Sequence, residues 1–315
     1  MTLRGRGVAP SLVFVFKKDI SMTNRSKFNI APYLFIAPTF ILIFIFSYYA
    51  VFNAVTISFT DASIGFAKSF IGLDNYIKLV NNTVFWTTFR NQGLITLTSV
   101  FNNIFFPILA AELLFFIHRS RIANIVKTVF VIPMLVPSIV TILTWRYLYN
   151  NTFGFNSLLN AIGLESLTRN WLNDGSVAIW SIIMIGFPFV SGLYFLIFHA
   201  GINNIGTDIF EAALIDGANN FQMVTQIHLP NIVPFIKVVF TLTLIGSLSG
   251  FGLVAATTGG GPGNATMIPS MMMYKVAFGE GNFGYASAIG VILLIIIMTL
   301  TLLTRKVMFA PSEEN

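Results

Sequence analysis

Few residues in this chain have the types and spacing that chemistry requires. Its three histidines, His118, His199 and His228, lie far apart in sequence, at the expected ends of apolar segments, and lack the spacing of metal ligands. Polar anchors at the ends of those segments are the better interpretation. Because there is no cysteine, a thiol nucleophile, a thiolate metal site and a disulfide are excluded. No metal site is predicted.

A glycine cluster, residues 259–264, superficially resembles a phosphate-binding loop. No basic residue follows it at the start of a helix, and no Gly-rich motif ending in Lys and Ser or Thr occurs anywhere in the chain. We therefore expect no nucleotide site, no bound cofactor and no catalytic residue. The cluster is interpreted as a tight turn, in which Gly and Asn supply positive φ angles.

Ionisable side chains interrupt the apolar segments at Glu112, Arg146 and Lys237. Arg146 and Lys237 lie close enough to segment ends for their long side chains to reach water. Glu112 lies deeper, but one carboxylate does not make a proton relay. This weakens the case for an ion-coupled secondary transporter, which stays open as an alternative.

The most informative polar stretch is residues 200–230, read as a short helix, a turn and a second helix. Asp208 could cap the first helix, and Glu211, three residues later, would complete a capping box. Gly217 is the natural residue for a left-handed helix stop. A defined helical turn is therefore predicted.

One face of this short helix is expected to carry Ile209, Ala212, Ala213 and Asp216, which follow the i, i+3, i+4, i+7 rule. Two alanines on that face leave room for another surface to approach closely. The stretch also contains no Lys or Arg. A protein partner covering it would explain why basic residues are missing there.

The elements that position these residues follow from composition. Of 315 residues 55% are hydrophobic and 10% charged, and the mean hydropathy is +0.79, which indicates a bilayer as the main solvent. A spanning helix needs roughly 20 apolar residues. Six such runs occur, at residues 32–59, 92–117, 126–149, 176–199, 232–257 and 284–305. The predicted class is an all-α membrane protein with six transmembrane helices.

Orientation follows from the positive charges. They concentrate in the leading segment, in the connection between the second and third runs, and after the sixth run. The positive-inside rule then places both termini in the cytoplasm. The net charge of +6 is explained by this topology, and no nucleic-acid partner is expected. We predict a cytoplasmic extension over residues 1–30, a membrane domain over 31–309 that includes the loop 200–230, and a cytoplasmic tail over 310–315.

The loop also carries a specific spacing. Glu211-Ala212-Ala213 is followed after three residues by Gly217, then after nine by Ile227, and after one more by Leu229-Pro230. This pattern resembles the EAA signature of permease subunits in binding-protein-dependent ABC importers. The resemblance implies a type I importer permease fold, in which this segment is a coupling helix that docks on an ATPase subunit. The coupling residues would be Glu211, Ala212, Ala213, Asp216 and Gly217.

Further pieces resemble the carbohydrate-uptake branch of that family and cover most of the chain from Pro32 onward. They include residues 33–38, 70–76, 145–150, 258–262 and 277–288, in the family's order and spacing. One departure is Leu214, which stands where many relatives have Arg. An ion pair made by that Arg is therefore not expected here.

The resemblance implies a multi-pass protein of the bacterial cell membrane that is a transport subunit and not an enzyme. Its expected partners are a second permease subunit, two ATP-binding cassette subunits that carry ATP and magnesium, and an extracytoplasmic binding protein that delivers a sugar or oligosaccharide. Other solutes, such as glycerol phosphate, stay open as cargo.

A sugar site needs hydrogen-bonding groups beside aromatic faces. The fourth and fifth runs offer Ser191, Tyr194, Thr243, Ser247 and Phe251, in the region where family members hold sugar. The alternative is that the small residues only allow close packing of helices.

Overall fold

The structure is a computed structural model that describes residues 31–64, 68–117 and 120–308. Within these residues the chain is helical, and the two β-bridges, Thr60 with Phe70 and Ser63 with Asn282, are isolated. The predicted all-α class is confirmed for this part of the chain. The predicted extension over residues 1–30 and the tail over 310–315 lie outside the described residues.

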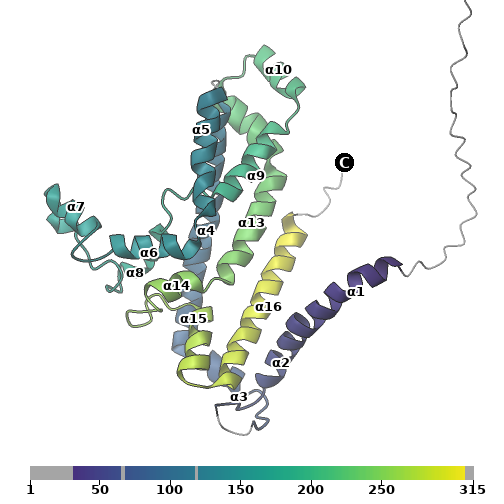
Figure 1. Ribbon diagram of the computed structural model, residues 1–315, viewed down its shortest axis with the longest axis vertical. Helices are drawn as coiled ribbons and strands as arrows, with labels where there is room; N and C mark the ends of the chain where they lie inside the picture. Colours follow the sequence, from purple (N-terminus) through teal and green to yellow (C-terminus); the bar gives the residue numbers. More distant parts are fainter. Residues whose placement is uncertain (1–30, 65–67, 118–119, 309–315) are drawn as a thin grey trace, which may run out of the picture. The chain divides into compact units, whose positions relative to one another are not determined.

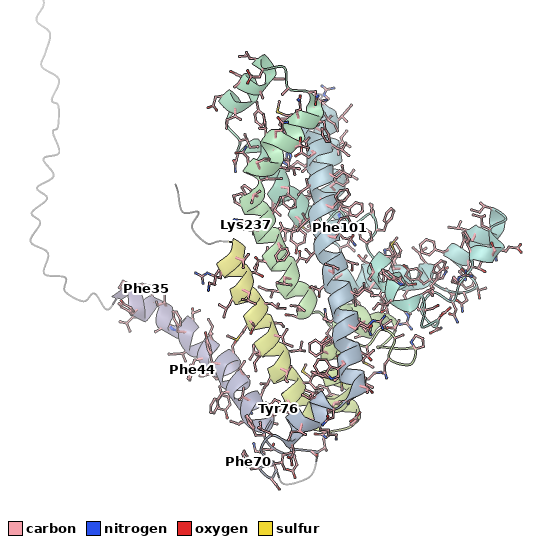
Figure 2. The ribbon with its side chains drawn as sticks, turned by 180° about the vertical axis from the view of Figure 1, so that it is seen from behind. Phe35, Phe44, Phe70, Tyr76, Phe101 and Lys237 are labelled. Atoms are coloured by element: carbon pink, nitrogen blue, oxygen red, sulfur yellow. The ribbon has the colours of Figure 1, made fainter. Side chains whose placement is uncertain are left out.

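The chain divides into two units, Met1–Ala50 and Val51–Asn315. The first holds α1 (Ala31–Ile43) and a π-helical turn, η1 (Phe44–Tyr48), and α2 (Tyr49–Ile57) continues from it into the second unit. Together they make an apolar helix over Pro32–Ile57, long enough to cross a membrane. Phe35 and Phe44, labelled in Figure 2, are 87% and 66% exposed.

The second unit is organised around α4 (Thr83–Phe115), which packs along α9 (Gly192–Asn203) and α13 (Val233–Leu248). The helix α16 (Phe283–Met308) packs against α13, α3 (Asp74–Val80) and α15 (Pro269–Tyr274). Figure 1 shows α3 and α15 at one end of this bundle and α10 (Thr207–Ile215) at the other.

Two apolar clusters lie along α4. The cluster near its C-terminal end joins Ala111 and Leu114 to Phe195 and Phe198 of α9 and to Val239 of α13. The other cluster joins the N-terminal half of α4 to α8 (Ala178–Met184), α14 (Gly252–Thr257), α15 and α16. The long helix α4 is therefore the common wall of both cores.

The third apolar run is not one helix, so that part of the six-helix prediction was wrong. It is divided into α5 (Ser120–Val131), the 3₁₀ turn η2 (Ile132–Leu135) and α6 (Ser138–Leu148), and the two parts are bent by 93°. Pro137 lacks a backbone N–H and disfavours the helical region for Val136. Val136 accordingly adopts φ −79° and ψ 126°.

The fourth and fifth runs are also interrupted. The fourth forms α8 and α9, separated by residues 185–191, where Gly186 and Phe189 have φ angles of 97° and 63°. The fifth forms α13 and α14 with a break at residues 249–251. It is preceded by α11 (Asn220–Gln222), the π helix η4 (Met223–His228) and α12 (Leu229–Asn231), bent by 65° from α13. By length and composition, three unbroken helices could cross a membrane among the described residues, or five if each bent pair counts as one span.

The remaining elements are α7 (Phe155–Ala161), η3 (Glu165–Leu167) and the π turn η5 (Lys275–Gly279). The glycine cluster forms the expected turn: Gly259, Gly260, Gly263 and Asn264 all have positive φ. Thr266, just after the cluster, stabilises this turn. Its side chain is fully buried, and its hydroxyl donates to the Gly261 carbonyl at 2.7 Å. That prediction is confirmed.

Asn91 of α4 fixes this turn to the bundle, and Asn91→Leu is expected to lower stability. Its amide donates to the carbonyls of Met267 (2.9 Å) and Asn264 (3.3 Å). Loss of the donor leaves the buried Met267 carbonyl without this partner, at a cost of about 2 kcal/mol, or about 5 °C in the midpoint of thermal unfolding in detergent. Asn81→Leu is the control, because Asn81 is exposed and bonds only within its own turn, to Ile77. Equal midpoints for the two variants would contradict the assignment.

Candidate functional site

The short helix predicted in the loop exists, as α10, but it starts differently. Its N-cap is Gly206, which has no side chain with which to cap, and Asp208 lies inside the first turn. The predicted capping box from Asp208 to Glu211 was therefore wrong. At position N2 the Asp208 carboxylate still interacts favourably with the positive N-terminal end of the helix dipole. A capping box forms instead at the start of the next helix, α11. The Gln222 N–H donates to Asn219 Oδ1 and the Asn219 N–H donates to Gln222 Oε1, each at 2.9 Å.

The helix ends as the sequence indicates. Gly217 has φ +76°, the left-handed region in which glycine carries no Cβ penalty. The Ala218 N–H donates to the Ala213 carbonyl at 2.9 Å, and the Gly217 N–H donates to Leu214 at 3.2 Å. These two bonds are the Schellman pattern. The stop at Gly217 is confirmed, and it fixes the direction in which the chain leaves α10.

The predicted face of α10 is confirmed as one surface. Ile209, Ala212, Ala213 and Asp216 line a hollow of about 540 Å³, together with Gly217 and the following turn. Gln222, Gln226 and Ile227 also line it. Ala213 is buried, whereas Ala212 and Asp216 are exposed. The alanines therefore keep space open beside the helix.

Apolar side chains at this end of the bundle are turned to the outside. Leu214 and Ile215 of α10 are 65% and 86% exposed, and Phe221 of α11 is 76% exposed. Between residues 200 and 230 there are three acidic residues and no Lys or Arg. We call Ile209, Leu214, Ile215 and Phe221 the loop apolar surface. Ile209 also lines the hollow, and all four are exposed side chains that a protein partner could bury.

The proposed substrate-pathway residues do not form one open site. Thr243 is 3% exposed, and its hydroxyl lies 3.5 Å from the Asn103 amide of α4. The Ser247 hydroxyl donates to Thr96 of α4 at 3.1 Å. Both side chains therefore help to pack α13 on α4, the role that the sequence left open.

Two other candidates lie on α9 and one lies at a cavity. Ser191 is the N-cap residue of α9, and Tyr194 packs against the core cluster that α9 shares with α4. Phe251 lines a cavity of about 470 Å³ together with Tyr274, Phe278 and other residues. Whether any of the five side chains contacts a substrate stays a prediction.

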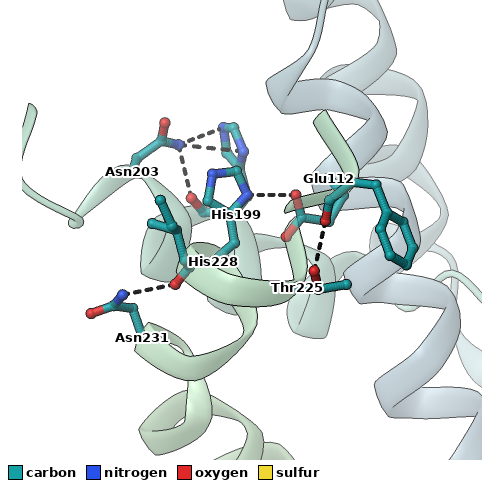
Figure 3. A network of polar contacts seen from close by, with 8 residues as sticks. Glu112, His199, Asn203, Thr225, His228 and Asn231 are labelled. Atoms are coloured by element: carbon teal, nitrogen blue, oxygen red, sulfur yellow. Dashed lines mark hydrogen bonds and ion pairs between the residues drawn. The ribbon is translucent and has the colours of Figure 1, made fainter. Parts of the chain in front are cut away.

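Sequence reasoning missed one buried polar contact. Glu112 of α4 accepts from or donates to Nδ1 of His228 across 2.7 Å (Figure 3), and the side chains are 7% and 0% exposed. The interpretation of His228 as an interfacial anchor was wrong. His199 is half-buried, with Asn203 beside its ring, and His118 lies outside the described residues. A carboxylate with no partner inside an apolar run was the signal that could have found the pair.

A family model matches residues 103–308, from the last third of α4 to the end of α16 and therefore including all of the loop. Its description is "Binding-protein-dependent transport system inner membrane component". The chain belongs to this family. This inner membrane component is accordingly a transport subunit with several membrane-spanning helices, and the resemblance read from the EAA spacing is confirmed at the level of the family.

Individual relatives agree. This inner membrane component is 34% identical over 295 residues to "Probable ABC transporter permease protein YurN" of Bacillus subtilis (strain 168), covering 93% of this chain and 100% of the relative. It is 29% identical to "Trehalose/maltose transport system permease protein MalF" of Thermococcus litoralis, covering 92% and 98%.

A solved structure has the same fold. It is a chain of a bacterial ABC transporter involved in the import of the acidic polysaccharide alginate, with a TM-score of 0.79 and 21% identity. The match covers 90% of this chain and 96% of that one. The broken helices described above therefore belong to a fold found in importers.

Proposed function

We propose that this inner membrane component is the permease subunit of an ATP-driven importer, and that α10 is its coupling helix. The observation that carries the proposal is the loop apolar surface on a helix whose end is fixed by Gly217. Ile215, at 86% exposure, is solvent-facing on a helix that also carries the complete EAA spacing. A side chain of this kind is stabilised when a partner buries it.

The partner is an ATP-binding cassette subunit that carries ATP and magnesium. The chain itself binds neither and is not an enzyme. Glu211 and Asp216 act as docking groups, while Ala212 and Ala213 allow close approach and Gly217 sets the angle of the loop. Two such subunits serve this chain and a second permease subunit, and each permease inserts one loop into one ATPase.

The proposed topology has six spans. The three continuous helices and the two bent pairs account for five, and α8 with α9 accounts for the sixth. Both termini are then on one side, and the positive-inside rule makes that side cytoplasmic. The start of α5, with Arg121, lies at the same end of the bundle as α10 (Figure 1), which supports a cytoplasmic loop.

The proposed cargo is a sugar or oligosaccharide delivered by an extracytoplasmic binding protein. Support comes from the trehalose/maltose permease relative and from the cavity beside Phe251. Aromatic residues line that cavity, among them Tyr274 and Phe278, together with Ser249 and Ser287. Aromatic faces beside hydroxyls suit sugar rings. Ser191, Tyr194, Thr243 and Ser247 stay candidates for the path deeper in the bundle.

Transport proceeds by a change between two states. Closure of the ATPase pair moves the two docked loops together, and the helices that follow each loop convert an inward-facing path into an outward-facing one. The difference between the affinities of the two permease states for the closed ATPase pair is what shifts the equilibrium.

Co-purification tests the proposal. The tagged wild-type chain, extracted from its native membrane, is expected to bring down an ATPase and a second permease. A double variant, Glu211→Arg with Gly217→Val, is expected to retain at most about a tenth of the ATPase, as loss of a docking site predicts. Recovery of the wild-type chain alone would refute the importer assignment and favour the ion-coupled alternative.

A further inference from the structure

The Glu112–His228 contact joins elements that meet only in the fold. Glu112 lies in the last turn of α4, and His228 is the final residue of the π helix η4, 116 residues later. Their 2.7 Å contact is enclosed, with the His228 side chain fully buried. It is the contact drawn between Glu112 and His228 in Figure 3.

The hydrogen bond between these two buried side chains is costly to lose, because either side chain would then be left unpaired in an apolar setting. Neither Nε2 of His228 nor Oε1 of Glu112 has a hydrogen-bond partner within the described part of the chain. The Nδ1–Oε2 bond is therefore the polar link at this position.

Aromatic rings surround the imidazole and come from two helices. Phe115, the last residue of α4, and Phe116, its C-cap, lie with ring centroids 4.6 and 6.3 Å from that of His228. Phe210 of α10 lies 5.4 Å from His228, at an interplanar angle of 87°, and 5.4 Å from Phe115. Edge-to-face rings at such separations attract one another. The imidazole therefore lies between the coupling helix and the end of α4.

Phe210 immediately precedes Glu211, so the side of α10 opposite the exposed Ile215 is anchored on this cluster. Phe210 contacts both His228 and Phe115. A displacement of α10 therefore acts on α4 by two routes, directly through Phe115 and through His228 and its hydrogen bond to Glu112. The apolar contacts can slide, whereas the 2.7 Å bond fixes direction and distance.

We propose that Glu112 and His228 are positioning residues that transmit movement of α10 into α4, with Phe210 as the contact between α10 and the pair. The inference rests on the proposed function, because it assigns a path for motion imposed by a docked ATPase. It predicts that the pair matters for transmission more than for folding, since well-packed apolar groups can replace a buried pair without loss of stability.

The test uses the full complex in lipid, with hydrogen–deuterium exchange measured by mass spectrometry before and after trapping with ATP, Mg²⁺ and vanadate. In the wild type, trapping is expected to change exchange both in α10 and in residues 109–115 of α4. In the double variant Glu112→Leu with His228→Leu, the change in α10 is expected to persist. The change in the α4 segment should fall about tenfold, a factor within the usual range of coupling free energies.

Glu112→Gln is the matched control, because a Gln side chain keeps a hydrogen bond to Nδ1 and should keep the α4 response. Retention of that response in the apolar double variant would overturn the inference, as would loss of the α10 change in an assembled complex. If the double variant fails to assemble, Phe210→Leu replaces it in the same measurement. This variant keeps the Glu112–His228 pair but removes its aromatic contact with α10, so the exchange response of residues 109–115 should still fall. Failure of the wild-type chain to recover an ATPase would refute the proposed function instead.

Discussion

Gly217→Val is expected to leave the chain folded in the membrane while removing most of the stimulation of ATP hydrolysis by the binding protein. A β-branched residue at φ +76° is strained by about 1–2 kcal/mol or more, and the strain is relieved by opening the Schellman turn. The direction of α10 is then no longer fixed. We expect stimulation to fall roughly tenfold, because about 1.4 kcal/mol separates tenfold populations. The measurement is ATPase activity of the reconstituted complex.

A matched control is Gly72→Val. Gly72 has φ +60°, and a Cβ there, as at Gly217, would meet nothing within 4 Å. Both variants therefore carry backbone strain without a steric clash, but Gly72 lies before α3, at the other end of the bundle. Gly217→Asn should stay close to wild type, because Asn tolerates the left-handed region. Equal loss in the Gly72 and Gly217 variants would show that strain alone, and not the loop, causes the defect.

Ile215→Asp is expected to abolish recovery of the ATPase subunit with the tagged chain. Ile215 is 86% exposed, so the substitution costs the folded chain little, whereas a carboxylate in a buried interface has to be desolvated. Loss of an interface anchor typically costs about 2 kcal/mol or more, which is about 30-fold in the dissociation constant. Affinity for the purified ATPase in nanodiscs gives the number.

Ile162→Asp supplies the comparison, because Ile162 is 68% exposed at the end of α7, away from α10. It should bind the ATPase as the wild type does. Normal binding by the Ile215 variant would exclude the loop apolar surface as the docking site, while equal loss in both variants would indicate a general effect of the charge on folding.

Local rules predicted much of the backbone of the loop over residues 200–230. The stop at Gly217 and the shared face of Ile209, Ala212, Ala213 and Asp216 depend only on helix periodicity and on the freedom of glycine, so a short segment contains all the information. The N-terminus was harder: Asp208 and Gly206 are both acceptable caps, and the chain uses the glycine. Energies of a few tenths of a kcal/mol separate such choices, and the surrounding structure decides them.

The broken helices could not be read from hydropathy, because an apolar run has the same composition whether it is straight or bent. Pro137 was a visible signal in the third run, but proline also occurs within α4, at Pro107, where the helix continues. In the fourth run the break includes a positive φ angle at Phe189, a non-glycine residue, which composition does not indicate. For the Glu112–His228 contact, the carboxylate inside an apolar run indicated that Glu112 needs a partner. It did not identify His228 as that partner, because 116 residues separate the two and no local pattern links them.

The interruption at residues 185–191 has a consequence for the lipid around the protein. Hydrocarbon offers no donor or acceptor, so non-helical backbone at membrane depth has to be covered by protein or wetted by a water-filled path. At the comparable break at residues 249–251, one backbone group finds its partner within the chain, because the Ser270 hydroxyl donates to the Gly250 carbonyl at 2.7 Å. The annulus of lipid should therefore contact continuous helices such as α16, and the interrupted side should face other protein or a water-filled path.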